Sequence, residues 1–259
     1  MKAKKSFGQH FLVDEHIAEE IAIGLLKTES IRNVLEIGPG KGVLTKYLSK
    51  HDTNLKVVEA DKDMVDFLSR NKIINSDQII FLDFLKLNLS KVFDGQQFYL
   101  IGNYPYNISS QILFKMINSK ELVPEMVGMF QKEVADRVIA PPGSKTYGVI
   151  SVLVQAYYTG ETIIDVGPNA FNPPPKVNSS VIRLKRRENF ELSCDDRLFR
   201  TVVKTSFSQR RKMLRNTLKP LIQDLSILDD PFFTQRPEQL GVKEFVDITN
   251  RIKNQNKID

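Results

Sequence analysis

The sequence has few of the residues that covalent cross-links, metal sites and membrane spans require. It contains one cysteine, Cys194, so no intramolecular disulfide can form, and this scarcity is typical of a reducing compartment. Its three histidines are scattered without metal-ligand spacing, and we therefore expect no metal site. No apolar run approaches the roughly 20 residues that cross a bilayer. The N-terminus has lysines but no apolar signal-peptide segment. We expect a cytoplasmic protein.

The length and the apolar pattern predict an α/β protein with a smaller helical part. At about one domain per 150 residues, the 259 residues allow one large domain or two unequal ones. The first two-thirds alternates short apolar runs with helical patterns, which is typical of a parallel, Rossmann-like sheet flanked by helices. After residue 188 the pattern is helical only. We therefore place a domain boundary between 1–187 and 188–259.

Apolar runs and turn residues give the expected elements. The expected strands are Asn33–Ile37, Leu55–Ala60, Gln78–Leu82, Phe98–Gly102, Glu125–Phe130, Val149–Tyr157 and Ser179–Leu184. The expected helices are Asp14–Leu26, Val43–Lys50, Met64–Asn71, Ser109–Ser119 and Lys132–Val138. Three consecutive prolines, Pro173 to Pro175, predict a rigid loop, because proline fits neither a helix interior nor a central strand.

The positive charge is concentrated in one segment. The chain has a net charge of +6, yet Arg183–Lys219 alone carries +8. Apolar residues in this segment recur at three-, four- and seven-residue spacings and predict one amphipathic helix: Val203, Phe207, Leu214, Leu218 and Leu221. Concentrated positive charge attracts polyphosphate backbones. A solvated helix face is the alternative. The candidate RNA-binding residues are Arg210, Arg211, Lys212 and Arg215.

A glycine-rich turn follows the first expected strand. Gly38, Gly40 and Gly42 come directly after an apolar run that contains Glu36. Glycines permit a tight turn and let a ligand approach the backbone. The spacing is one residue shorter than a nicotinamide-type fingerprint. It resembles motif I of S-adenosylmethionine-dependent methyltransferases, although ordinary tight turns share the pattern.

Two acidic residues end the next two strands. Glu59 stands 21 residues beyond Gly38, and Asp83 ends the strand after that. A carboxylate at such a strand tip can accept both ribose hydroxyls of an adenosine ligand. Either acid alone could be a helix N-cap. A glycine turn and two acids on three consecutive strands together favour an adenosine-type cofactor.

The segment Asn103–Tyr106, of sequence NYPY, follows another strand. It resembles the (N/D)-x-P-(Y/F) motif of methyltransferases that act on exocyclic amino groups, including adenine N6. An aromatic amine is a poor nucleophile because its lone pair is delocalised. Acceptors at Asn103 Oδ1 and the Tyr104 carbonyl could orient that lone pair, and Tyr106 could stack on the base. Catalysis would then be mainly positioning and electrostatics. The alternative is an Asx turn.

Phe171 precedes the proline loop and has two interpretations. It could clamp the second face of a splayed-out adenine, because enzymes that modify bases hold them against aromatic side chains. It could equally be a core residue under the loop.

The motifs together resemble the ribosomal RNA adenine dimethyltransferases over nearly the whole chain. Three further segments carry the resemblance: Lys5–Leu12 (KSFGQHFL), Ser206–Leu214 (SFSQRRKML) and Arg236–Leu240 (RPEQL). The resemblance implies S-adenosylmethionine as methyl donor and two methyl transfers to N6 of each of two adjacent adenosines. Those adenosines lie in a hairpin near the 3′ end of small-subunit rRNA. It also implies that 1–187 is the catalytic domain and 188–259 the ribosome-binding domain.

The resemblance also implies roles for single residues. Three would line the cofactor pocket: His10, Leu12 and Gly38. Glu59 would bind the ribose and Asp83 the adenine amine of the cofactor. Asn103 would contact both the cofactor and the substrate amine. Tyr104 stands where leucine is commoner, so the pocket wall can differ there.

Other functions remain open at this point. A large-subunit rRNA dimethyltransferase of the antibiotic-resistance type shares the cofactor and amine motifs, although the basic C-terminal segment favours the small-subunit enzyme. A ribosome-assembly or transcription factor could keep the fold without turnover, but the intact motif set favours activity. A DNA adenine methyltransferase would need a target-reading domain that we do not recognise. We expect a monomer, because no pattern resembles a dimer seam.

Overall fold

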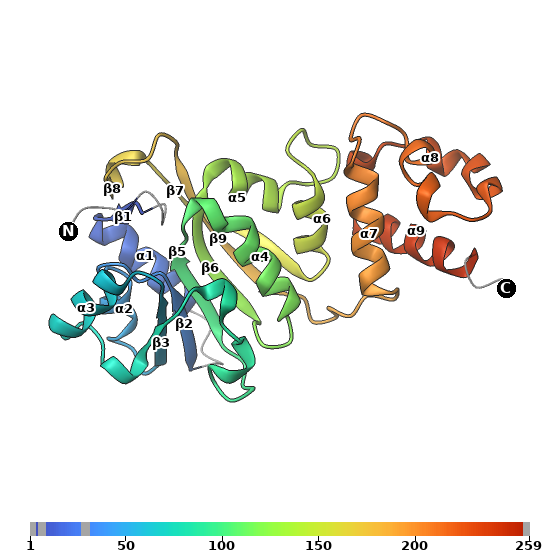
Figure 1. Ribbon diagram of the computed structural model, residues 1–259. Coiled ribbons are helices and arrows are strands. Elements are labelled where there is room, and N and C mark those ends of the chain that lie inside the picture. Colours follow the sequence, from blue (N-terminus) through green and yellow to red (C-terminus); the bar gives the residue numbers. More distant parts are fainter. Residues whose placement is uncertain (1–3, 5–8, 27–31, 256–259) are drawn as a thin grey trace. The chain divides into compact units, whose positions relative to one another are not determined.

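The computed structural model describes residues 4, 9–26 and 32–255 (Figure 1). The chain forms two compact units. The first, which we call the sheet unit, holds the residues up to Ala135 together with Gly160–Arg186. The second, the helical unit, holds Asp136–Thr159 and the residues from Arg187 onward. None of the helices in the described ranges is long and apolar enough to cross a membrane.

A seven-stranded, mostly parallel sheet runs through the chain in the order β4-β3-β2-β5-β6-β9-β7 (Figure 1). The strands are β2 (Asn33–Ile37), β3 (Asn54–Glu59), β4 (Ile79–Phe81), β5 (Tyr99–Asn103), β6 (Glu125–Gln131), β7 (Tyr158–Val166) and β9 (Ser179–Arg186). The five neighbouring strands β4, β3, β2, β5 and β6 pair in parallel, and β9 pairs with β6 in antiparallel fashion. The central strands read as continuous apolar runs because both faces of a parallel sheet are covered.

The strand order creates a crevice at one edge of the sheet. The chain passes from β2 to β3 and β4 on one side, then returns to place β5 on the other side of β2. Open α/β sheets bind ligands at such a switch point, beyond the carboxyl ends of the strands. A separate two-stranded sheet pairs β1 (Phe11–Leu12) with β8 (Phe171–Asn172) in antiparallel fashion.

Five helices accompany the sheet: α1 (Glu15–Leu26), α2 (Thr45–Leu48), α3 (Lys62–Arg70), α4 (Ser109–Asn118) and α5 (Lys132–Ile139). Helix α1 is amphipathic, and its apolar stripe of Ala18, Ile21, Ala22 and Leu25 is buried in the core with residues of α2, α3 and the strands. Asp61 caps the start of α3 by accepting the Asp63 N–H at 3.0 Å, which fixes where β3 turns into the helix.

The helical unit contains α6 (Val149–Gln155), α7 (Asp196–Phe207), α8 (Leu214–Thr217) and α9 (Val242–Gln255). Helix α7 packs against α6, α8 and α9. The ring of Phe207 lies 6.2 Å from that of Tyr147 and 5.9 Å from that of Phe245, centroid to centroid. These aromatic contacts join the C-terminal helices to the segment that contains α6.

Two elements differ from the sequence-based expectations. The run Val149–Tyr157 was expected as a strand, but its residues Val149–Gln155 form α6, because a short buried run has no period that separates a helix from a strand. The single helix expected through Leu221 breaks after Phe207, and α8 starts anew at Leu214. Leu214 and Leu218 are still buried, so their burial was expected correctly although the helix was not.

The division into units also differs from the one expected at Arg187. The segment Asp136–Thr159 groups with the C-terminal helices because α6 packs against α7. The polar strand β7 was not expected at all, since most of its side chains are exposed and show no apolar run.

Candidate active site

The glycine turn closes the carboxyl end of β2. Gly38 and Gly40 have φ angles of +66° and +56°, a region that favours glycine. A Cβ on Gly38 would meet nothing within 4 Å, so this side of the turn faces open space. The Gly38 N–H donates to the Val58 carbonyl at 2.9 Å, and the Gly40 N–H donates to Glu59 Oε2 at 3.2 Å. The turn is therefore held against β3.

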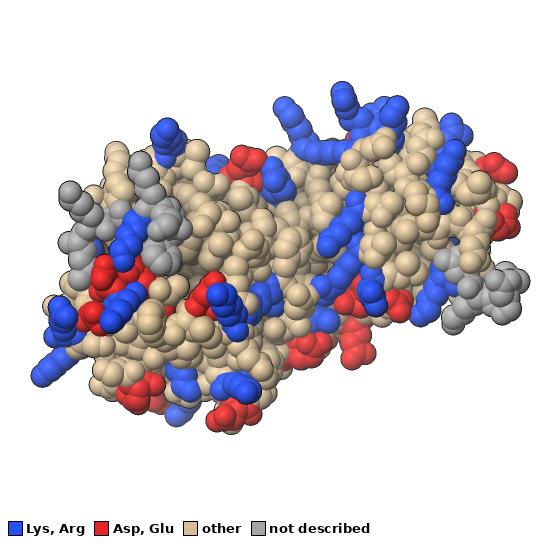
Figure 2. Space-filling model, viewed as in Figure 1, with Lys and Arg blue, Asp and Glu red and all other residues tan. Residues whose placement is uncertain are grey.

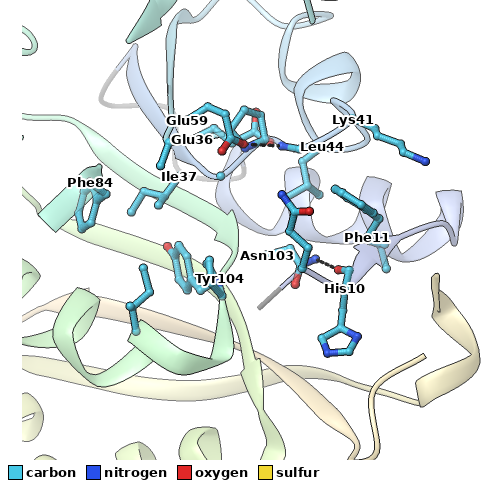
Figure 3. Close-up of a pocket in the computed structure, with 18 of the residues that line it drawn as sticks. His10, Phe11, Glu36, Ile37, Lys41, Leu44, Glu59, Phe84, Asn103 and Tyr104 are labelled. Carbon is cyan, nitrogen blue, oxygen red and sulfur yellow. Dashed lines mark hydrogen bonds between the residues drawn. The ribbon is translucent and has the colours of Figure 1, made fainter. Parts of the chain in front are cut away.

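Two buried carboxyl groups lie behind this turn (Figure 3). Glu59 also accepts the Asp61 N–H at 2.8 Å, and burial raises its pKa. Glu36 accepts a hydrogen bond from Thr45 Oγ1 at 2.7 Å. Burial raises the pKa of Glu36 to about 8; the bond from Thr45 opposes this rise, and repulsion from Glu59 adds to it. Glu36 is thus mostly protonated at neutral pH, which reduces charge repulsion beside Glu59.

A cavity of about 660 Å³ opens at the carboxyl ends of β2, β3, β4 and β5. The sequence-predicted residues that line it are His10, Leu12, Gly38, Glu59, Asp83, Asn103 and Tyr106. Asp83 Oδ1 accepts the Leu85 N–H at 2.9 Å, which orients the loop after β4. The cavity is within the size range of small-molecule and cofactor sites. The residues expected at the ends of three consecutive strands, Gly38, Glu59 and Asp83, therefore line the same cavity.

Residues Gln9–Leu12 form a wall of the cavity, which we call the N-terminal strap. Gln9 Nε2 donates to Asp61 Oδ2 at 2.9 Å, and Lys4 Nζ lies 2.6 Å from Asp61 Oδ1. Strand β1 within the strap pairs with β8. Sequence reasoning missed the contact with Asp61, because no local pattern signals a pairing between side chains that lie 52 residues apart.

Asn103 is oriented by the strap (Figure 3). Its Nδ2 donates to the His10 carbonyl at 3.0 Å. A carbonyl can only accept, so this bond assigns the nitrogen and directs Oδ1 elsewhere as an acceptor. In the described part of the chain, neither Asn103 Oδ1 nor the Tyr104 carbonyl accepts a hydrogen bond. The two acceptors that the NYPY motif predicted are thus both available.

The side chain of Tyr104 packs against glycines instead of facing a ligand. Its ring is 1% exposed, and an added Cβ on Gly102 would lie 2.7 Å from it. A Cβ on Gly128, in β6, would overlap the ring directly. The hydroxyl is buried and has no hydrogen-bond partner in the residues described, and burial raises its pKa. Tyr104 can therefore contribute its carbonyl while its ring fills the floor of the site.

Tyr106 is held by two neighbours. Its hydroxyl lies 2.5 Å from Ser179 Oγ, and its ring stacks on that of His10 at a centroid distance of 5.5 Å and an interplanar angle of 25°. His10 Nδ1 donates to the Pro173 carbonyl at 2.8 Å, since that oxygen can only accept. The His10 side chain therefore supports Tyr106, and its backbone carbonyl positions Asn103.

Phe171 does not lie where a clamp on a base would require. Its side chain is 3% exposed and belongs to the core cluster that includes Leu12 and Ala18. It pairs with the strap through its backbone in β8. The core interpretation of Phe171 agrees with the structure, because a ring buried in this way cannot stack on a base.

The basic residues expected to bind RNA lie in the helical unit, where Figure 2 shows many Lys and Arg side chains. Arg211, Lys212 and Arg215 are exposed. Arg210 is different: its Nη1 and Nη2 donate to the carbonyls of Lys145 and Ser144 at 2.6 and 3.0 Å. Arg210 therefore anchors a loop within the unit, and three of the four predicted residues present free surface charge.

Comparison with known proteins identifies the family. The family model described as ribosomal RNA adenine dimethylase matches residues 1–230. The chain belongs to the ribosomal RNA adenine dimethylase family. A relative from Bacteroides thetaiotaomicron is 52% identical over 98% of this chain and 95% of its own. One from Flavobacterium johnsoniae is 51% identical over 98% and 97%. Both are named ribosomal RNA small subunit methyltransferase A.

Two solved structures share the fold of this family member. A dimethyladenosine transferase from Plasmodium falciparum has a TM-score of 0.81 at 24% identity and covers 95% of this chain and 98% of its own. The 23S rRNA methyltransferase ErmE has a TM-score of 0.66 at 23% identity and covers 93% and 99%. At these identities the likeness concerns the fold, and it confirms the expected class I methyltransferase sheet.

The cofactor of the family is S-adenosylmethionine, and the cavity fits it. The open side of Gly38 gives backbone access, and the carboxylates of Glu59 and Asp83 stand at successive strand ends. The donor set contains no cluster of metal ligands among the residues described. The expectation of an S-adenosylmethionine-dependent methyltransferase is thus confirmed by family and by cavity.

Proposed function

We propose that the protein transfers methyl groups from S-adenosylmethionine to N6 of two adjacent adenosines near the 3′ end of small-subunit rRNA. The observation that supports this most directly is the fixed orientation of Asn103, whose Nδ2 is occupied by the His10 carbonyl at 3.0 Å. The names of the relatives that are about half identical over nearly the whole chain favour the small subunit over the large one.

The glycine turn and the loop after β4 would hold the cofactor. Glu59, which accepts the N–H groups of Gly40 and Asp61, would bind the ribose hydroxyls through its remaining lone pairs. Asp83 would accept a hydrogen bond from the adenine amino group, since only its Oδ1 caps the Leu85 N–H. S-adenosylmethionine supplies an electrophilic methyl group on a sulfonium, which is a good leaving group.

The target amine is positioned by acceptors on both of its N–H groups. Asn103 Oδ1 would accept from one and the Tyr104 carbonyl from the other, which would fix the orientation of the nitrogen lone pair. The Tyr104 N–H donates to the Met129 carbonyl at 3.2 Å, which anchors the backbone of Tyr104 to β6. Tyr106 stacks on the base with the face that His10 does not cover. Orientation of the amine supplies the rate enhancement, and no strong general base is needed.

RNA binding falls to the basic surface of the helical unit. Arg211, Lys212 and Arg215 provide cations for the phosphate backbone, and their contribution depends on salt through counterion release. The partner is the immature small subunit in the cytoplasm. The protein acts on it as a monomer.

The test supplies labelled S-adenosylmethionine with unmethylated small subunits, or with large-subunit rRNA, and maps modified nucleosides by mass spectrometry. We expect dimethyladenosine at two adjacent small-subunit positions. Label only in large-subunit RNA would move the assignment to the resistance-type enzymes. Tight subunit binding without label would favour an assembly factor.

The same assay tests the amine motif. Asn103→Ala removes one acceptor and should lower methyl transfer at least 100-fold, while RNA binding changes by no more than about threefold. Gln111→Ala, which removes an exposed amide on α4, is the matched control and should keep full activity. Near-normal turnover of Asn103→Ala would refute the positioning role of Asn103.

A further inference from the structure

Lys115 makes an unusual set of hydrogen bonds in the sheet unit. Its Nζ, on α4, donates to the carbonyls of Phe84, Leu85 and Leu87 at 2.6, 2.9 and 2.6 Å. It also lies 5.0 Å from the centroid of the Phe84 ring. An ammonium group has three N–H donors, so all three can be used by carbonyls of one loop.

This loop is the one that begins with Asp83. Phe84–Lys86 form a single 3₁₀ turn, capped at its start by Asp83 and followed by Leu87. A turn of this length is weak by itself: within it the Phe84 carbonyl accepts the Leu87 N–H at 3.1 Å, and further donors must come from outside the turn. Lys115 supplies these donors from another element. Phe84 and Leu85 line the cofactor cavity together with Asp83.

The opposite end of α4 is tied to the amine motif. Ser109 Oγ lies within hydrogen-bond distance, 3.2 Å, of both the Pro105 and the Tyr106 carbonyls. Helix α4 spans only Ser109–Asn118, and its buried residues fix it in the core. One short helix therefore contacts both the loop that faces the cofactor and the segment that faces the target amine.

The hydrogen-bond acceptors around Lys115 match an ammonium group. Burial lowers the pKa of Lys115, and the negative charge of Asp83 offsets only part of this shift. Three carbonyl acceptors and no donor surround the nitrogen, and only the ammonium can satisfy all three.

We propose that Lys115 is a positioning residue for the adenine of the cofactor. It holds the loop Asp83–Leu87 so that the Asp83 carboxylate accepts the adenine amino group. This inference rests on the proposed role of Asp83. It assigns to Lys115 an effect on cofactor affinity and not on the chemical step.

Lys115→Met tests the proposal in the full-length protein. Methionine retains an apolar stem beside Phe84 but has no donor. Because each of these bonds involves a charged group, we expect the dissociation constant for S-adenosylmethionine to rise about tenfold or more. The kcat at saturating cofactor should stay within about threefold. Lys86→Met is the matched control: it changes an exposed lysine of the same loop and should leave both constants unchanged.

A cofactor analogue identifies the path of the effect. S-adenosylhomocysteine and its analogue with hydrogen in place of the adenine 6-amino group are titrated calorimetrically into wild type, Lys115→Met and Asp83→Ala. If Lys115 acts through Asp83, the affinity loss of Lys115→Met shrinks to less than about twofold with the analogue. An equal loss with both ligands would show a merely structural role and overturn the inference.

The Asp83 variant separates this inference from the assignment of the adenine site. If Asp83→Ala binds both ligands as wild type does, the proposed role of Asp83 fails, and the inference fails with it. If Asp83→Ala binds S-adenosylhomocysteine more weakly than wild type but binds the analogue equally well, and Lys115→Met binds both ligands normally, only the inference fails. Lys115→Arg is the second variant should the methionine protein not fold. Its planar guanidinium cannot direct three donors from one nitrogen, so an intermediate affinity is expected, and wild-type affinity would contradict the proposal.

Discussion

The titration of Glu36 gives a quantitative prediction for stability. This carboxyl is 1% exposed on β2, and its pKa rises from 4.5 to about 8 because burial disfavours the charged form. Between these two pH values the folded protein keeps a proton that the unfolded chain has released. The free energy of unfolding therefore falls as pH rises through this window.

The size of the effect follows from the shift. At 1.36 kcal/mol per pKa unit, a shift from 4.5 to about 8 corresponds to at most about 5 kcal/mol. The contribution of the neutral Glu36 is complete below pH 4.5 and is lost by about pH 8. Glu36→Gln is neutral at every pH and keeps an oxygen that can accept from Thr45 Oγ1. Its stability should depend less on pH than that of the wild type.

Urea unfolding between pH 5 and pH 9 measures this difference. At pH 5 we expect wild type and Glu36→Gln to agree within about 1 kcal/mol, and at pH 8.5 the variant should be more stable by several kcal/mol. Glu19→Gln, at an exposed position on α1, controls for the general loss of one negative charge. Parallel stability curves for wild type and Glu36→Gln would refute the reasoning, because they would mean that Glu36 titrates alike in both states.

Two further predictions concern packing and charge. Gly128→Ala should destabilise the protein by about 2–3 kcal/mol, because the new methyl overlaps the Tyr104 ring. Tyr104→Leu in the same chain should recover about 1–3 kcal/mol relative to the sum of the single changes, and additive losses in urea unfolding would contradict the contact. Arg211→Glu with Arg215→Glu should weaken subunit binding and flatten its salt dependence. Arg210→Met should instead lower the thermal midpoint of the helical unit, since Arg210 donates to two backbone carbonyls. An unchanged salt slope in the double variant would contradict RNA binding by Arg211 and Arg215, and an unchanged midpoint in Arg210→Met would contradict the anchoring role of Arg210.

The half of the sheet that carries the cofactor site could be predicted from the sequence. Strand β2 has the expected bounds. Glu59 is the last residue of β3, and Asp83 follows shortly after the end of β4. The reason is physical: parallel strands bring their carboxyl ends to one edge, so residues at strand ends meet without any knowledge of tertiary contacts. Glycines with positive φ add a second local signal.

Elements without a local signal could not be predicted. Helix α6 consists of side chains that are nearly all buried, so its sequence lacks the alternation that separates strands from helices. The apolar spacing after Val203 continues past Phe207 although the helix ends there. Both α7 and the separate helix α8 bury apolar residues of this pattern, such as Val203 and Leu214. Here tertiary packing overrides the periodicity.

The supporting contacts of the site were also beyond sequence reasoning. From the sequence alone, a lysine on an amphipathic helix is expected on its solvated face. Lys115 instead donates to three carbonyls of a loop that precedes it by about 30 residues in the sequence. His10 lines the cavity as expected, but its ring stacks on that of Tyr106, a contact that the sequence does not indicate. Such roles depend on which segments meet across the fold, and no spacing along the chain encodes them.

The pairing of the N-terminal strap has a consequence for the order of folding. His10 meets Pro173, 163 residues further along the chain, and β1 closes on β8 in the same region. Closing so long a loop is entropically costly and slow compared with local contacts. During synthesis from the N-terminus, the glycine turn and its carboxylates can assemble on β2 and β3 well before the strap finds its partner strand. The wall of the cavity that the strap provides is therefore completed only after β8, near residue 172, has been synthesised.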